Sequence, residues 1–418
     1  MADVPGPFIT GANMSRTHAI VLLVATLAGT ALAGPLSPPS GAPSSTGKTT
    51  QEVFDRVAQA DDALWNRIAR TPQGLAEPRI PVQSLGGTSF TAHIISDPGS
   101  YYLTGNITVE AGRTAIIIDS SDVELDLSGF TITGNNAPGS RGISTTFNRF
   151  NITVRNGSIV NMGGEALNLG QAPSSIIEHI KVRKTGGIGV LLGPHNIGRN
   201  IVVHEAGATG ISIGDRSTLV DSIANNCATS GIGTSGDALI ERCSAYYNGT
   251  HGFILGVNTT VVGSRAGYNT ATGFTTTSPN VSISGSMAYQ NGDDGFRLAG
   301  ENHRIESCVA RGNAADGFQV GGTTLISNST ASSNGVGANI TDGAGFRLAG
   351  NANRVDQCMA NGNDIGVAIT GGGNMVVRTS FTFNPTRYTA SAGNNVALMI
   401  VTPGDGFNAS NPWANLAH

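Results

Sequence analysis

Residues that could perform acid–base chemistry gather in one stretch of this sequence, residues 291–350, although only 12% of the chain is charged. Asp294 and Asp316 each stand directly before a glycine, and Arg297 and Arg347 each stand two residues after one. Two neighbouring carboxylates repel each other, so that the pKa of one rises or a cation such as Ca²⁺ binds between them. Arginine offers a fixed positive charge to an anionic ligand. These four residues are therefore our catalytic candidates for a negatively charged substrate.

Three further polar residues complete the candidate site. We assign Asp293, Gln319 and His251 to substrate binding, because they occupy or adjoin the same recurring positions around the glycines. The alternative is structural, since an aspartate before a glycine is an ordinary turn pair and an outward arginine is an ordinary solvated residue. The pattern suggests one metal, Ca²⁺ between Asp294 and Asp316, and the sequence indicates no other cofactor.

A recurring glycine sets the positions of these side chains. From residue 142 to residue 367 a glycine, in most repeats followed by an aromatic or aliphatic residue, returns every 21 to 23 residues, with one interval of 28. A period of this length, with short β-type segments between turns, is typical of a solenoid in which each repeat forms one coil. We therefore predict an all-β, single-stranded parallel β-helix of about twelve coils. Stacked coils are separated by about 4.8 Å, which would place Asp294 close to Asp316.

The repeat also predicts the interior of the coils. Each regular coil reads Ser or Cys, any residue, Ala, and then, three residues on, Asn, followed by the glycine step. We expect the asparagines of successive coils to form a ladder of side-chain hydrogen bonds. Cys243, Cys308 and Cys358 hold equivalent places several coils apart, beyond the reach of a disulfide, so we expect free thiols; Cys227 falls on a turn. The aromatic residues after the glycines should stack in the core: Phe253, Phe274, Phe296, Phe318 and Phe346.

The chain ends differ from the repeats in composition. Residues 1–33 have the features of a secretory signal peptide with an Ala-Leu-Ala cleavage motif, and Met14 is an alternative start of translation. Residues 34–47 form a Pro/Ser/Gly-rich linker. Residues 48–93 are expected to form an N-terminal helix and cap. The apolar residues over 51–70 have helical spacing, and this helix either covers the first coil or binds a partner. The β-helix is expected over 94–384, and a C-terminal cap and tail over 385–418.

Composition excludes several classes of partner. The net charge of −4 provides no basic field, so nucleic acid is not an expected partner. No stretch after residue 33 is apolar for long enough to span a bilayer. We expect an exported protein, either secreted, periplasmic or at the cell surface, without a membrane span in its mature form. The sequence does not indicate an oligomeric state.

The glycine repeat resembles the right-handed parallel β-helix proteins of the pectate-lyase-like superfamily. The Asn…Gly-Ile/Phe period is also similar to repeats of the periplasmic nitrous-oxide-reductase maturation type. The segments Pro-Gly-Ser-Tyr-Tyr-Leu-Thr-Gly-Asn at 98–106 and Asn-Pro-Trp-Ala-Asn at 411–415 resemble uncharacterised secreted bacterial β-helix proteins. The resemblance covers about residues 90–385 and implies right-handed coils. It implies either lyase chemistry with calcium and an arginine base, or hydrolysis by two carboxylates. The chain departs from both patterns, since the polygalacturonase motifs and a pectate lyase site motif are missing.

Three functional hypotheses follow. The first is a carbohydrate-facing exported protein that binds or degrades an anionic polysaccharide, as a lyase or a glycoside hydrolase would. The second is a non-catalytic surface protein whose long face serves adhesion or assembly. The third, which rests on the repeat resemblance alone, is a periplasmic accessory protein for metal delivery.

Overall fold

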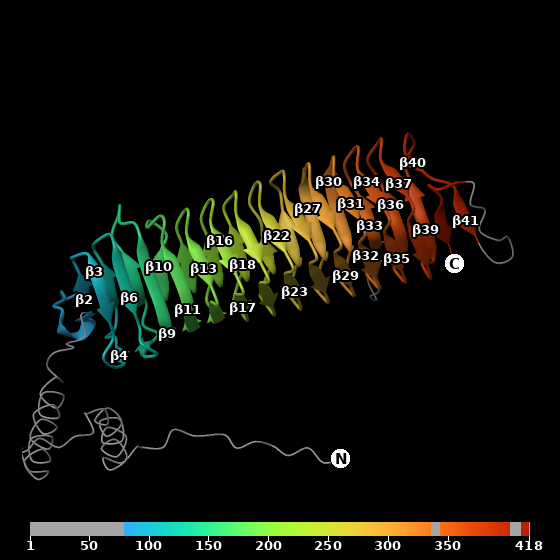
Figure 1. Cartoon of the computed structure of the whole chain (residues 1–418). Helices are drawn as coiled ribbons and strands as arrows, with labels where there is room; N and C mark the ends of the chain where they lie inside the picture. The colour runs from blue at the N-terminus through green and yellow to red at the C-terminus, as the bar shows by residue number, and fades with distance from the viewer. Residues whose placement is uncertain (1–78, 336–342, 402–410, 418) are drawn as a thin grey trace, which may run out of the picture. The chain divides into compact units, whose positions relative to one another are not determined.

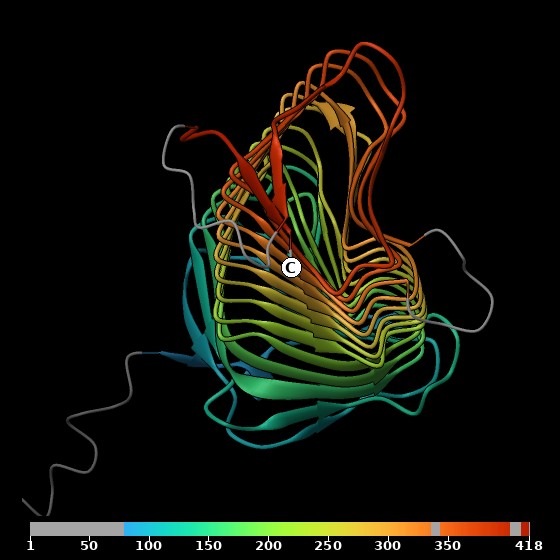
Figure 2. The ribbon, with the colours of Figure 1, turned by 90° about the vertical axis from the view of Figure 1, so that its right-hand side faces the viewer.

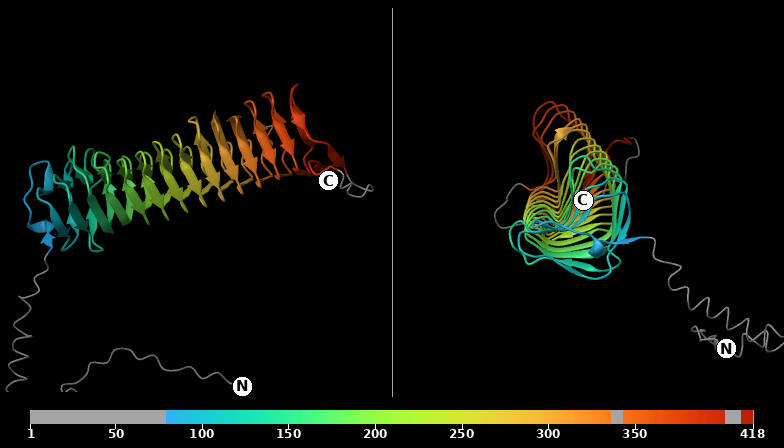
Figure 3. Two further views of the ribbon diagram at one scale, coloured as in Figure 1. Left: turned by 45° about the horizontal axis from the view of Figure 1, so that its top comes forward. Right: turned by 90° about the vertical axis from the view of Figure 1, so that its left-hand side faces the viewer.

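The computed structural model describes residues 79–335, 343–401 and 411–417. The expected signal peptide, linker and helix over 51–70 lie outside these residues. The described chain winds into an all-β solenoid whose coils stack along one axis (Figures 1 and 3). All of its strand pairs are parallel, and each strand pairs with its counterpart one coil further on.

The strands form three faces along the solenoid. The first face is a sheet of 14 strands: β2 (Thr91–Ile95), β5 (Thr114–Ile118), β8 (Arg141–Thr145), β10 (Leu167–Leu169), β12 (Val190–Leu192), β15 (Ile211–Ile213), β18 (Ile232–Thr234), β21 (Phe253–Ile254), β24 (Phe274–Thr276), β27 (Phe296–Glu301), β30 (Phe318–Gly322), β33 (Ala344–Leu348), β36 (Ile365–Ile369) and β39 (Thr386–Ala390).

The second face contains β1 (Ile80–Pro81), β3 (Gly99–Tyr102), β6 (Val123–Asp126), β9 (Ile152–Met162), β11 (Ile176–Thr185), β13 (Ile197–Arg199), β16 (Thr218–Val220), β19 (Leu239–Glu241), β22 (Thr260–Val262), β25 (Ser282–Ser284), β28 (Arg304–Glu306), β31 (Leu325–Ser327), β34 (Arg354–Asp356), β37 (Met375–Val377) and β40 (Asn395–Val396).

The third face shares the long strands β9 and β11 and adds β4 (Ile107–Thr108), β7 (Thr131–Thr133), β14 (Val202–Ala206), β17 (Ile223–Asn225), β20 (Ser244–Tyr246), β23 (Arg265–Gly267), β26 (Met287–Tyr289), β29 (Val309–Arg311), β32 (Thr330–Ser332), β35 (Met359–Asn361), β38 (Ser380–Thr382), β41 (Met399–Val401) and β42 (Asn415–Ala417).

The solenoid has 14 coils on its first face, more than the expected twelve. The glycine step recurs in eleven coils, from β8 to β36, so the period did not mark the first two coils, at β2 and β5, or the last, at β39. Within the described residues no capping helix covers the first coil; the helix expected over 51–70 lies outside them. At the first coil, a single 3₁₀ turn, η2 (Val82–Ser84), buries Val82, and Leu85 packs against the same core.

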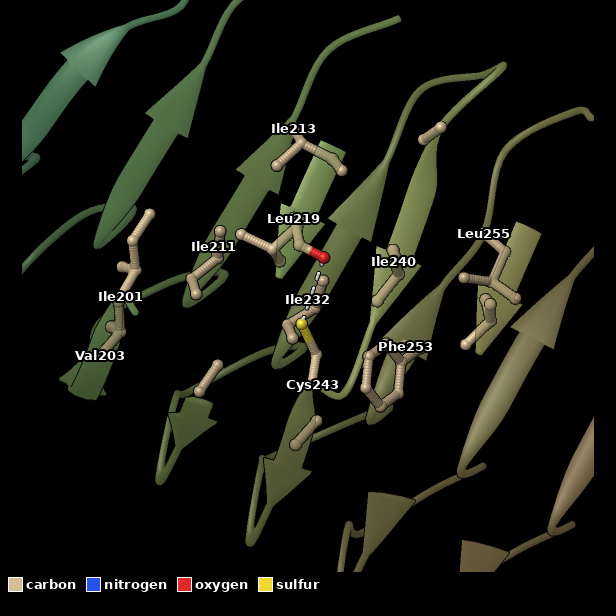
Figure 4. Packing of buried hydrophobic residues seen from close by; sticks show 14 of the residues in the cluster. Ile201, Val203, Ile211, Ile213, Leu219, Ile232, Ile240, Cys243, Phe253 and Leu255 are labelled. Carbon is tan, nitrogen blue, oxygen red and sulfur yellow. Dashed lines mark hydrogen bonds between the residues drawn. The ribbon is translucent and has the colours of Figure 1, made fainter. Parts of the chain in front are cut away.

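The core confirms the predicted stack of aromatic rings. Phe253, Phe274, Phe296, Phe318 and Phe346 are fully buried, with ring centroids 4.5 to 5.1 Å apart and planes within 8° of parallel. In earlier coils aliphatic residues such as Ile211 and Ile232 hold the same place (Figure 4). Offset stacking adds about 0.5 to 1.5 kcal/mol per aromatic pair to the burial of the rings.

The asparagine ladder is also confirmed. Each Asn side chain from Asn248 to Asn334 donates from Nδ2 to Oδ1 of the next coil's asparagine at 2.9 Å. The ladder is buried, so each amide satisfies donors that water cannot reach. Cys227 occupies the place just before this ladder, and its N–H donates to Asn248 Oδ1 at 3.1 Å. All four cysteines are free and buried, as predicted for Cys243, Cys308 and Cys358. Figure 4 shows the Cys243 thiol directed at the carbonyl oxygen of Leu219.

The later coils have longer strands on the first face. Strands β27, β30, β33, β36 and β39 have five or six residues, whereas those from β10 to β24 have two or three. Seen along the axis, the orange and red coils also project further at one corner (Figure 2). The inserted segment that makes one interval 28 residues long lies mostly outside the described residues, but its flanks, Gly335 and Gly343, lie against each other. Arg297, Gln319 and Arg347 therefore lie on the longer strands of the first face.

Candidate functional site

The strand register brings three of the predicted site residues into one row. Arg297 on β27 pairs with Gln319 on β30, which pairs with Arg347 on β33. Their neighbours inward along each strand, Phe296, Phe318 and Phe346, are core rings, so the alternation of a strand turns the row outward. Because adjacent strands are separated by about 4.8 Å, the two guanidinium groups bracket a span of two coils.

A groove lies over this row. A cavity of about 340 Å³ is lined by three aspartates of the turns, by the row itself and by two small residues: Asp293, Asp294, Arg297, Ala315, Asp316, Gln319, Gly343 and Arg347. A second cavity of about 300 Å³ shares Arg297 and Gln319 and continues along the strands to Glu301 and Gly350. We call these two adjoining cavities the arginine groove. Six of the seven predicted site residues line it; the seventh, His251, does not.

Asp294 and Asp316 form a short ladder of their own at the floor of the groove. The N–H of Asp316 donates to Asp294 Oδ1 at 2.9 Å, and the N–H of Ala344 donates to Asp316 Oδ1 at 2.7 Å. Both residues are almost fully buried. The carboxylates thus join successive coils in the same way as the asparagines do, while also lining the cavity.

The two arginines, which the sequence treats alike, differ in their surroundings. Arg347 forms a two-point ion pair with Asp316, from Nε to Oδ2 and from Nη2 to Oδ1 at 3.0 Å, and its side chain is only 18% exposed. Arg297 is 49% exposed and lies at 3.4 Å from Asp293 and 3.9 Å from Asp294. Exposed ion pairs at such distances contribute little. Arg297 is therefore the cation that a ligand can reach, and Arg347 is held by the protein.

Burial raises the pKa of Asp294 to about 7, and the nearby charges of Asp316 and Asp293 act in the same direction. The hydrogen bond from the Asp316 N–H and the charge of Arg297 oppose this rise without cancelling it. A carboxyl group with such a pKa can give or take a proton near neutral pH, as general acid–base catalysis requires.

His251 lies two coils before Asp294 in the same pre-glycine position. Its Nδ1 accepts from the N–H of Thr272 at 3.3 Å, which leaves its proton on Nε2. Burial lowers the pKa of His251, so the ring is neutral at pH 7. In this state its Nε2–H can donate a hydrogen bond, but the ring cannot supply a positive charge.

The donor set does not fit a calcium ion. Ca²⁺ takes six to eight oxygen ligands, whereas both oxygens of Asp316 are already engaged by Arg347 and by the N–H of Ala344. Across residues 79–335, 343–401 and 411–417, no group of three or more acidic, histidine or cysteine side chains is arranged to hold a metal. We derive no step from calcium at Asp294 and Asp316.

Two residues of the site were missed by the sequence. The hydroxyl of Thr272 donates to Asp293 Oδ2 at 3.1 Å and so holds that carboxylate beside Arg297. Glu301 lines the far end of the groove because β27 extends beyond the usual three residues. The signal for Thr272 was available, since it occupies the pre-glycine position. Glu301 lies outside the repeated positions and gave no signal.

Coils of parallel strands stacked into three faces define a parallel β-helix. The sequence matches the model of a family described as "right handed beta helix region" over residues 92–238 and 231–353. The chain therefore belongs to this family, and the resemblance inferred from the repeats is confirmed. Within the described residues, no helix is long and apolar enough to cross a membrane.

Several solved structures share this fold. The A-modules of two mannuronan C-5 epimerases of Azotobacter vinelandii, AlgE4 and AlgE6, align over 72% and 74% of this chain and 91% and 92% of their own, at 15% and 16% identity and a TM-score of 0.52 each. The tailspike protein of the E. coli bacteriophage HK620, solved with a pentasaccharide, aligns over 82% of this chain and 79% of its own, at 10% identity and a TM-score of 0.50. No curated protein matches the sequence. At these identities the likeness shows the fold.

Proposed function

We propose that this protein is an exported, carbohydrate-facing β-helix protein that binds an anionic polysaccharide in the arginine groove and acts on it by acid–base chemistry. The observation that carries the proposal is the position of Arg297. This residue presents an accessible positive charge directly beside Asp294, a buried carboxyl group whose pKa is about 7. A uronate or a similar acidic sugar provides both a carboxylate for the arginine and a bond that needs proton transfer.

Recognition begins at Arg297 and Gln319. The loose contacts of Arg297 with Asp293 and Asp294 can give way to a planar, two-point pair with the sugar carboxylate, which is stronger. Gln319, one coil further on, has both a donor and an acceptor for sugar hydroxyl groups. Arg347 has a different role, since its pair with Asp316 keeps the floor of the groove in place.

Binding of an acidic sugar prepares Asp294 as a proton donor. A further negative charge beside those of Asp293 and Asp316 favours the neutral form of Asp294, so binding raises its pKa. In hydrolysis, Asp294 gives its proton to the glycosidic oxygen while Asp293 takes a proton from the attacking water. In elimination, Asp293 takes the proton next to the sugar carboxylate that Arg297 neutralises, and Asp294 protonates the leaving oxygen.

The solved relatives support the class of ligand. Two of them act on mannuronan by name, and a third was solved with a pentasaccharide bound. They share only the fold with this chain, so the residues of the arginine groove rest on their own geometry. Export by residues 1–33 belongs to the proposal. N-terminal sequencing of the protein recovered from outside the cytoplasm of a bacterial host should begin at Gly34.

The test is a screen of the purified full chain on uronate polysaccharides and on neutral glucans. Reducing ends report any cleavage, whereas ultraviolet absorbance of unsaturated ends reports elimination alone. Arg297→Gln should abolish turnover of the uronate polymers. Arg304→Gln is the matched control, because Arg304 is equally exposed at 56% but lies on the second face. Binding without products would refute the catalytic part, and no binding to any uronate polymer would refute the proposal.

A further inference from the structure

Four of the seven tyrosines of the chain gather on three successive coils, and none of the four lines the arginine groove. Tyr246 ends β20, and Tyr289 ends β26; both pair in register with Gly267, which ends β23 between them. Tyr247 and Tyr268 follow β20 and β23 by one residue. The stacking distance of Tyr247 and Tyr268 is 4.9 Å, with planes 7° from parallel.

Tyr289 lies flat on the backbone of the preceding coil. A Cβ atom added to Gly267 would lie 2.7 Å from Cζ and 2.9 Å from both Cε atoms of the Tyr289 ring. A point nearly equidistant from three adjacent ring carbons lies over the ring face and not beside its edge. One face of Tyr289 is therefore pressed against Gly267, and the opposite face is turned away from the backbone.

Two neighbouring tyrosines stand at an angle to the half-buried Tyr289 ring. The Tyr268 ring stands at 83° to the Tyr289 ring, with centroids 5.3 Å apart, and the Tyr246 ring is tilted by 55° at 6.2 Å. Burial, together with the tyrosines around it, raises the pKa of Tyr289 to about 12. We call Tyr246, Tyr268 and Tyr289 the tyrosine platform.

Core packing does not explain the platform. Tyr268 of the platform and Tyr247, which stacks on it, are 42% and 57% exposed, and both have a φ of 55°, a left-handed conformation that disfavours bulky side chains. In later coils the same place is held by Gln290, Gly312, Ser333, Gly362 and Phe383, all with a positive φ. The chain thus places large aromatic side chains where the backbone favours glycine and where little apolar area is buried.

The charge beside the platform indicates the ligand. Tyr289 pairs in register with Arg311 on the next coil, and Arg311 is exposed. A cation bound by the aromatic faces would be repelled by this guanidinium group, whereas an acidic ligand would be attracted. Tyrosine combines a flat apolar face with a hydroxyl group, which suits a ring that has both C–H and O–H groups.

We propose that the tyrosine platform and Arg311 form a saccharide-binding site separate from the arginine groove. A pyranose ring stacks on the free face of Tyr289, and its carboxylate, or that of the next sugar unit, pairs with Arg311. The choice of an acidic saccharide as the ligand rests on the proposed function, whereas the geometry of the tyrosine platform is independent of that function. Tyr289 ends β26 on the third face, and Asp293 follows four residues later, in the turn that leads to β27 on the first face. One polymer chain can therefore contact both the tyrosine platform and the arginine groove.

Gly267→Ala tests the platform without removing a tyrosine. Gly267 lies in the extended β23, a conformation that alanine also adopts, so the new methyl group displaces only the Tyr289 ring. Calorimetric titration of the full chain with oligomers of mannuronate and galacturonate should show affinity reduced about 3- to 10-fold, the effect of losing one stacked ring. Tyr289→Ala should match it. Tyr388→Ala, an exposed tyrosine on β39, is the control and should bind as the wild type does.

The outcomes separate this proposal from the previous one. Unchanged affinity in both Gly267→Ala and Tyr289→Ala, with turnover still lost in Arg297→Gln, would refute the platform and leave the arginine groove intact. Weaker binding in the platform variants with no effect of Arg297→Gln would refute the groove instead. Self-association of the chain that depends on Tyr289, without saccharide binding, would identify the platform as a protein contact and refute the proposal. A circular dichroism spectrum and an unfolding midpoint for each variant control for folding.

Discussion

Replacing Asp294 with asparagine should stabilise the protein above neutral pH and leave its stability unchanged in acid. The wild-type carboxyl group has an ordinary pKa of 3.8 when exposed and a pKa of about 7 in the fold. Folding therefore favours the protonated form. The stability that this group contributes is fully present below about pH 4 and is lost as the pH rises through 7. Asparagine has almost the same shape and is neutral throughout.

The expected magnitude follows from the two pKa values. A difference of about three units corresponds to roughly 4 kcal/mol, at about 1.4 kcal/mol per unit. Asp294 is almost fully buried, so solvent screening reduces this value little. The asparagine Oδ1 can still accept from the N–H of Asp316, and the hydrogen bond at 2.9 Å is kept. The loss of the charge is therefore the main change.

Urea unfolding followed by circular dichroism at pH 4 and pH 8 measures the effect. Asp294→Asn should unfold at the same urea concentration as the wild type at pH 4, and at a clearly higher one at pH 8. Asp293→Asn makes the same chemical change one residue earlier, on a side chain that is 37% exposed, and should shift the midpoint little at either pH. Equal stabilisation at both pH values, or none at pH 8, would show that Asp294 is not neutralised by burial. The same variant should lose turnover because it has no proton to give.

Three further predictions concern the arginines, the ladder and the thiols. Arg347→Gln should destabilise the fold by about 3 to 5 kcal/mol, because it removes the charge opposite the buried Asp316. Arg297→Gln should leave the urea midpoint unchanged. Equal midpoints for the two variants would show that the two arginines are equivalent. Asn291→Ala should cost about 2 to 5 kcal/mol, because it leaves two buried donors of Asn269 without their acceptor, and a smaller fall in the midpoint would mean that water replaces the amide. Burial raises the pKa of the Cys308 thiol to about 12. A thiol reagent should therefore modify none of the four buried cysteines before unfolding and all four after it. Rapid labelling of the native chain would contradict their burial.

The interior of the solenoid was predictable because one inward position repeats the same physical demand in every coil. Phe296 must fill the space between Phe274 and Phe318, and Asn291 must satisfy both Asn269 and Asn313, so the period alone places them. The first two coils escaped this reasoning. Their strands, β2 and β5, build the same wall from isoleucine and threonine without a glycine step.

The site was predictable only in its positions. The register places Arg297 and Arg347 in equivalent slots, as the repeat implies, yet their partners come from different coils. Arg297 contacts Asp293 and Asp294 of its own coil, and Arg347 pairs with Asp316 of the coil before it. The coil before Arg347 supplies Asp316, whereas the coil before Arg297 supplies Thr272 in the same slot. An exact repetition of the six residues at 295–300 and 345–350 therefore produces two arginines with opposite roles.

The tyrosine platform shows the same principle on the outer surface. Neither Tyr289 nor Gly267 is unusual when considered alone, since both stand at an outward position of the third face. Their order along the axis matters, because the glycine of one coil leaves the space into which the tyrosine of the next coil folds back. In a solenoid, chemistry on the outer surface depends on pairs of residues from successive coils. Single positions of the repeat define the scaffold, whereas pairs of outward residues on neighbouring coils form the surfaces that we propose as ligand-binding sites.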